Sequence, residues 1–181
     1  MDAKDIREWI QFVFLVVGAT LAIIVFFQNL RQRRLENALK MVALFRESLR
    51  PKDLEHWRDL FMRSCELASA PAGFFAGENG KHIPLGDMWS ESSEDDDAIE
   101  RIAENLEIIC YEICRRTIDA RFVYYELGQL FTETHRWLSE ITATSDDKLF
   151  IDRHYPWTKR AFERYGKQFK SWPRRTFAYI E

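Results

Sequence analysis

The chain has 181 residues and a formal net charge of −3, and 46% of its residues are hydrophobic. Enough aromatic residues are present, at 14%, to build a core, which excludes a chain that is disordered throughout. Seven glycines and five prolines exclude a collagen-like chain, and three cysteines cannot close a disulfide framework. The cysteine content therefore indicates a reducing compartment, and the net charge gives no overall reason to expect nucleic-acid binding.

The segment 9–30 contains no charged residue, although the residues on either side of it are rich in charge. As a helix, its 22 residues would be roughly 33 Å long at about 1.5 Å per residue, enough to cross a hydrocarbon core of about 30 Å. A cleaved signal peptide is disfavoured, because the leader 1–8 has mixed charge and the apolar run is too long. We therefore predict a short extracytoplasmic segment (1–8), a transmembrane helix (9–30) and a cytoplasmic domain (31–181).

The distribution of basic residues predicts the orientation. Only Lys4 and Arg7 precede the apolar segment, whereas six basic residues occupy the twenty positions after it. We expect a single-pass inner-membrane protein with its N-terminus outside and its domain in the cytoplasm. Three of the basic residues, Arg31, Arg33 and Arg34, are expected to contact anionic headgroups, at about 1 kcal/mol each.

Gly18 and Ala22 are four residues apart in the apolar segment. Small residues at this spacing let two transmembrane helices approach closely, so self-association through this face is one interpretation. Chance is the other, because such residues are common in transmembrane helices.

The remaining sequence predicts an all-α domain of about five helices. Apolar residues at helical spacing predict a helix over 35–49 that continues from the span, and Pro51 predicts a break before a helix over 53–69. Glycines and prolines predict a long loop over 70–91, whose aromatic residues would pack over the helices or meet a partner or the membrane. Further helices are predicted over 93–113, from Asp119 to 141, and after Pro156, with no convincing strand.

The stretch 106–137 resembles a family of uncharacterised bacterial single-pass membrane proteins. The matching pattern is a helix with Leu and Glu near its start, a basic turn leading to Asp, and a second helix with a Gly that ends in Trp. The matching positions are Leu106, Glu107 or Glu112, Asp119, Gly128 and Trp137. The run 38–58 is also similar. The resemblance implies a membrane-anchored helical domain, with no established activity and no catalytic residue.

Motifs of catalysis and metal binding are absent from the sequence, and the four histidines are scattered. Cys110 and Cys114 are most simply small buried apolar residues. Glu100, Glu104 and Glu107 share a helix face, which is most simply a solvated surface. We therefore expect no enzymatic activity, no metal and no cofactor.

Charge is segregated within the domain. Residues 91–107 contain eight acids against Arg101, and residues 148–175 contain nine bases against Asp152 and Glu163. Three interpretations remain open. The two segments attract each other within or between subunits, the basic aromatic tail (148–181) lies on the anionic inner leaflet, or the tail binds a nucleotide, a signalling phosphate or a nucleic acid. The candidate ligand- or lipid-binding residues are Arg153, His154, Tyr155, Trp157, Lys159, Arg160 and Arg164.

Two functions are compatible with these features. The first is a membrane-anchored binding or regulatory module that recruits a partner or senses a ligand, with the bilayer, a second copy of the chain and a protein encoded nearby as expected partners. The second is an effector of antiphage defence that assembles and perturbs the membrane when a partner or nucleotide triggers it. Against the second, the span has no polar stripe that could line a pore.

Overall fold

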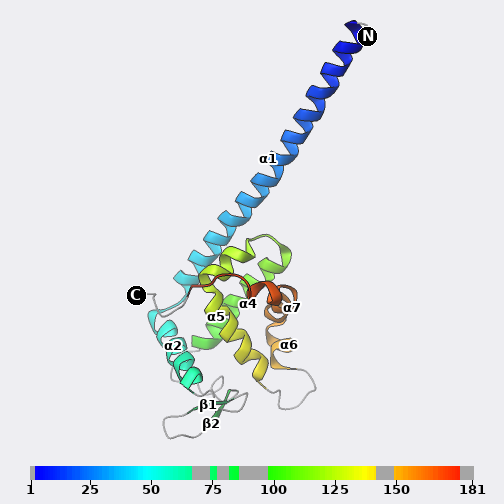
Figure 1. The fold of residues 1–181 in the computed structure, drawn as a ribbon. Coiled ribbons are helices and arrows are strands. Elements are labelled where there is room, and N and C mark those ends of the chain that lie inside the picture. The colour runs from blue at the N-terminus through cyan, green and yellow to red at the C-terminus, as the bar shows by residue number, and fades with distance from the viewer. Residues whose placement is uncertain (1–2, 67–73, 77–81, 86–97, 142–148, 176–181) are drawn as a thin grey trace.

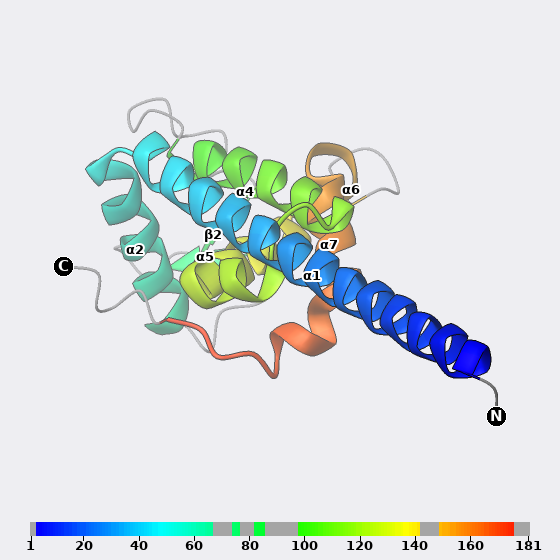
Figure 2. The ribbon, with the colours of Figure 1, turned by 90° about the horizontal axis from the view of Figure 1, so that it is seen from above.

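The computed structural model describes residues 3–66, 74–76, 82–85, 98–141 and 149–175, and these are mostly helical, which confirms the all-α fold class. The long helix α1 (Ala3–Ser48) projects far beyond the domain with its N-terminal part, and its C-terminal part packs against the other helices (Figures 1 and 2).

Helix α1 has two kinds of surface along its length. From residue 7 to residue 29 all side chains are exposed, including Phe14 at 74% and Phe27 at 64%. Further on, Ala38, Val42 and Phe45 are buried at spacings of four and three, as expected of one helix face that meets a core. By length and composition α1 can cross a membrane, and the helix expected over 35–49 is confirmed as its continuation.

Helix α2 (Pro51–Glu66) begins at the proline that the sequence marks as a break. Its first turn is fixed by Asp53, which accepts a hydrogen bond from the backbone N–H of Arg50 at 2.9 Å and pairs with Arg101 at 3.1 Å. Burial opposes ionisation of Asp53, but the hydrogen bonds from Arg101 and Arg50 outweigh it and lower its pKa. Asp53 therefore joins the start of α2 to α4.

The core lies between α4 (Ala98–Arg115), α5 (Ala120–Glu140) and the elements around them. The predicted apolar stripe of α4 is buried: Ile99, Ile102, Ala103, Leu106, Ile109, Cys110 and Ile113. On α2, Trp57 stacks on Phe61 with ring centroids 5.3 Å apart, and its indole N–H donates to Thr134 of α5 at 3.2 Å. The buried indole N–H of Trp57 is thus paired where α2 meets α5.

Two short strands lie in the segment that was predicted as a loop. Strand β1 (Phe74–Ala76) pairs antiparallel with β2 (His82–Pro84), at the end of the domain far from the N-terminus of α1 (Figure 1). The expectation of no strand was wrong here, because three-residue strands are too short to show a period-two pattern. The predicted helix start at 93–96 and the acids 91–97 lie outside the described residues.

The last helices are α6 (Phe150–His154) and α7 (Pro156–Phe169), the second of which was predicted from Pro156. Helix α7 has no capping side chain of its own at Tyr155. Glu107 of α4 takes this role: its carboxylate accepts hydrogen bonds from the backbone N–H groups of Trp157 and Thr158, both at 2.7 Å, and from the Thr158 hydroxyl. A carboxylate at a helix N-terminus also meets the favourable end of the helix dipole.

We predict that Glu107→Ala lowers the free energy of unfolding by about 2 kcal/mol, because two helix N–H groups and a hydroxyl lose their acceptor. Thermal unfolding of the full chain in detergent, followed by circular dichroism, measures this loss. Glu104→Ala is the matched control, since Glu104 is exposed on the same helix. Equal effects of the two substitutions would contradict a capping role for Glu107.

Candidate functional site

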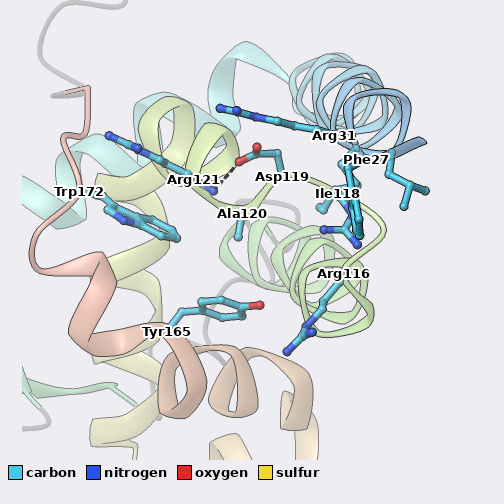
Figure 3. A pocket seen from close by; sticks show the side chains of 11 residues that line it. Phe27, Arg31, Arg116, Ile118, Asp119, Ala120, Arg121, Tyr165 and Trp172 are labelled. Atoms are coloured by element: carbon cyan, nitrogen blue, oxygen red, sulfur yellow. Dashed lines mark hydrogen bonds between the residues drawn. The ribbon is translucent and has the colours of Figure 1, made fainter. Parts of the chain in front are cut away.

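A cleft of about 600 Å³ lies where α1 meets the turn between α4 and α5 and the C-terminal end of α7 (Figure 3). The side chains around it come from three parts of the chain that are distant in sequence. Its lining residues are Phe27, Leu30, Arg31, Arg34, Arg116, Ile118, Asp119, Ala120, Arg121, Tyr165 and Trp172.

Two hydrogen bonds fix the position of the α4–α5 turn beside α1. The N–H of Asp119 donates to the carbonyl of Arg34 at 3.1 Å, and the side-chain amide of Asn37 donates to the carbonyl of Thr117 at 3.3 Å. Ile118, at 5% exposure, anchors the turn in the core. The turn and α1 therefore form one continuous wall of the cleft.

Two local features let the chain make this turn. Arg116 has a left-handed backbone with φ of 61°, which reverses the direction of the chain after α4. Asp119 then caps α5 as predicted, since its carboxylate accepts from the backbone N–H groups of Arg121 at 2.9 Å and Phe122 at 3.0 Å. Arg116 and Asp119 themselves, with Ile118, Ala120 and Arg121, line the cleft.

The cleft is strongly basic. Four arginines line it, against Asp119 as the acidic lining residue. Within the part of the chain that the structure describes, no carboxylate lies within 4.0 Å of any of these four guanidinium groups: Arg31, Arg34, Arg116 and Arg121. Tyr165 and Trp172 form the facing wall, opposite α1 (Figure 3). Such a hollow is suited to an anion that carries an apolar or aromatic part.

The seven candidate residues of the tail do not gather at one hollow. Arg153 and His154 are exposed, and Tyr155 is buried. Trp157 packs edge-on against Tyr111, and Arg160 lies over the Trp157 ring at 5.2 Å.

The remaining tail candidates have partners within the fold. Lys159 pairs with Asp152, and Arg164 donates to the carbonyl of Cys114 at 3.0 Å. Ligand binding by the tail stays a prediction. The Glu107 contacts with α7 are made to backbone N–H groups and a hydroxyl, so attraction between the acidic and basic segments also stays a prediction.

The arginines that follow the apolar segment separate into two groups. Arg31 and Arg34 line the cleft and Arg33 does not. Gly18 and Ala22 are exposed, and a methyl group added at Gly18 would meet no atom within 4 Å. Contact with headgroups and self-association both stay predictions.

Sequence reasoning did not identify Arg116, Arg121, Tyr165 and Trp172 as members of a site. A signal was present in the run R-R-T-I-D-A-R at 115–121, which was recognised only as a basic turn. Its proximity to Arg31 and Arg34 depends on the packing of α1 on α5, which no local pattern specifies.

A second hollow, of about 620 Å³, lies between α5 and α7. His135 lines it and stacks on Phe162 with ring centroids 3.7 Å apart. Burial lowers the pKa of His135 to about 4, so the imidazole is neutral at physiological pH.

The two cysteines that the structure describes as free are not activated thiols. Burial raises the pKa of Cys110 well above its ordinary value, and burial also raises that of Cys114 in spite of the nearby Arg164 and Arg160. The side chain of Cys65 lies outside the described residues. Among described side chains, no three metal-ligating groups are close enough to hold one ion.

No protein-family model, no curated protein and no solved structure matches this chain. The resemblance to bacterial single-pass membrane proteins therefore stays a prediction.

We predict that Arg116→Gly leaves the free energy of unfolding unchanged or raises it by up to about 1 kcal/mol. Glycine adopts a left-handed backbone without steric cost, whereas arginine does not. Arg115→Gly, one residue earlier in α4, should instead cost about 1 kcal/mol, because glycine is unfavourable inside a helix. Denaturant unfolding of both full-length variants in detergent measures the contrast, and a destabilised Arg116→Gly variant would contradict the left-handed geometry.

We predict that His135 makes the protein less stable in mild acid. Between pH 6.5 and about 4 the unfolded chain binds a proton at this residue and the folded chain does not, so stability falls as the pH falls through this window. His135→Phe keeps a ring against Phe162 and should flatten that part of the pH–stability curve by up to about 3 kcal/mol. His154→Phe, at an exposed histidine, is the control for the exchange of a histidine for a phenylalanine.

Proposed function

We propose that the protein is a single-pass inner-membrane protein whose helical domain is a binding module held against the cytoplasmic face. The observation that supports this best is the continuity of α1, which is both the apolar segment and a core helix of the domain. A module on a flexible linker would be free to turn. Here the domain is held at a fixed angle to the segment that would cross the bilayer.

A second set of contacts strengthens the connection between α1 and the domain. Glu126 of α5 is 8% exposed, and its carboxylate accepts from Arg46 of α1 at 2.6 Å and from Arg175 at 3.2 Å. The N–H of Arg175 also donates to the carbonyl of Tyr125 at 2.8 Å. Because a buried carboxylate that loses its partners is costly, these contacts oppose separation of α1 from α5.

The position of the basic cleft supports a binding role. In α1 the segment without charged residues ends at Leu30, and Arg31 and Arg34 of the cleft follow within one turn. A rigid connection at this point would place the cleft at the level of the headgroups, on the side with more basic residues. We propose two protein partners for the module. One is a protein encoded nearby, and the other is a second copy of the chain that would pack against Gly18 and Ala22.

We predict that the N-terminus is outside the inner membrane and the C-terminus inside. A cysteine in the variant Asp2→Cys should react with a membrane-impermeant maleimide in intact spheroplasts. The Glu181→Cys variant should react only after the membrane is made permeable. Wild-type chain gives the background from the three native cysteines. Release of the protein by alkaline carbonate, or labelling of both variants in intact cells, would contradict the proposal.

The membrane potential of the same cells distinguishes a binding module from a membrane-perturbing effector. A binding module leaves the response of a membrane-potential dye unchanged when expression is induced. Depolarisation in proportion to expression would contradict our proposal and favour the effector.

A further inference from the structure

We propose that the arginine-lined cleft is a specific site for the phosphate of an anionic phospholipid of the cytoplasmic leaflet, such as phosphatidylglycerol. This inference rests on the proposed function, because it requires α1 to cross the membrane with the domain at its cytoplasmic side. It goes further by naming the ligand class and the residues that recognise it.

Along α1 the lining of the cleft changes from apolar to basic, as a phospholipid changes from apolar acyl chains to a charged headgroup. Phe27 and Leu30 belong to the apolar segment, and Arg31 and Arg34 belong to the next turn. From Phe27 to Arg34 the helix rises about 10 Å, at about 1.5 Å per residue. Acyl carbons would lie against the exposed Phe27 ring, and the phosphate, just outside the hydrocarbon, would lie beside the guanidinium groups.

The cations of the cleft come from two separate elements. Arg31 and Arg34 lie on α1, whereas Arg116 and Arg121 lie on either side of the α4–α5 turn. Among the described residues none of the four forms an ion pair with a carboxylate, and four guanidinium groups face the single negative charge of Asp119 in the lining of the cleft. A phosphate between the two elements would supply the negative charge that offsets the repulsion between the arginines, and its oxygens can accept from several guanidinium groups at once.

The acidic lining residue does not take the place of this anion. Asp119 turns one carboxylate oxygen to the N–H groups of Arg121 and Phe122 at the start of α5. Its role is therefore structural, and the cleft keeps an excess of positive charge.

The facing wall fits the same ligand. Tyr165 and Trp172 are half-buried and line the cleft opposite α1 (Figure 3). Aromatic rings with a polar edge are favoured at the level of headgroups, where one side meets apolar chains and the other meets water. These two rings close one side of the hollow, so the arginines line a cleft and not a flat basic surface.

The site is largely formed before a ligand arrives. The bonds from Asp119 to Arg34 and from Asn37 to Thr117 hold the turn against α1, so binding needs little rearrangement of the backbone. Arg33 has the same charge and lies in the same turn of α1, but it does not line this preformed cleft.

Native mass spectrometry of the full chain tests the proposal, with phosphatidylglycerol or phosphatidylcholine added to the detergent. The double variant Arg31→Gln/Arg116→Gly removes one guanidinium from each element of the cleft. We expect it to retain phosphatidylglycerol about 20-fold less than the wild type, at roughly fivefold for each basic residue. The matched control is Arg33→Gln/Arg115→Gln, which removes the same charge from the neighbouring positions and should stay within about twofold of the wild type.

Thermal unfolding separates loss of the site from loss of the fold. In zwitterionic detergent alone, the Arg31→Gln/Arg116→Gly variant should unfold at or above the wild-type Tm, because two repelling charges are removed. Phosphatidylglycerol should raise the Tm of the wild type and of the matched control but not that of this variant. If the variant does not fold, the wild type still tests the site by its preference for phosphatidylglycerol over phosphatidylcholine.

Three results would overturn the proposal: equal loss of lipid in the matched control, equal retention of both lipids by the wild type, or displacement of the lipid by glycerol phosphate at the same concentration. The last result would assign the cleft to a soluble phosphate. Failure of the proposed function is distinguishable, because it is read from maleimide labelling and carbonate extraction. If the protein is correctly inserted but shows no lipid preference, the lipid proposal fails and the proposed function stands.

Discussion

One uninterrupted helix meets two different surroundings along its length, and the rest of the structure depends on this. Every side chain of α1 is exposed from residue 7 to residue 29, and less than three turns later Ala38 is fully buried in a protein core. A helix is stiff over this distance because every backbone group is bonded within it. The domain must therefore pack around the C-terminal part of α1 in an arrangement that leaves the N-terminal part free.

The domain meets this requirement with contacts that join elements distant in sequence. Glu126 connects α5 to α1, Asp53 connects α2 to α4, and Glu107 connects α4 to α7. Each is a carboxylate that receives more than one donor at a junction where helices meet. Because such groups cost free energy when they lose a partner, they favour one arrangement of the helices over others that would bury similar apolar area. Gly128 contributes by its lack of a side chain, since an added methyl group would lie 2.9 Å from the Cβ atom of Arg174, which crosses α5 there.

The helices were predictable from sequence, but the site was not. Apolar spacing indicated the buried stripe of α4, Pro51 and Pro156 indicated helix starts, and Asp119 indicated a cap, because each of these signals is local. The pairing of β1 with β2 escaped because short strands leave no pattern. The cleft escaped because Arg31 and Arg116 are separated by 85 positions and meet only when α1 packs on α5. The candidate residues of the tail formed a cluster in sequence, whereas the helical geometry of α6 and α7 distributes them over several surfaces.

The contacts of α4 connect the cleft to the rest of the domain. Its C-terminal end leads into the turn that bears Arg116, and one face of it holds the N-terminus of α7 through Glu107. Helix α7 in turn brings Tyr165 to the cleft, so two walls of the hollow are positioned by the same helix. An anion bound in the cleft as proposed would add contacts to this one arrangement of α1, the turn and α7. Because a ligand stabilises the arrangement that it contacts best, it would strengthen the packing that the hydrogen bonds of the turn already hold.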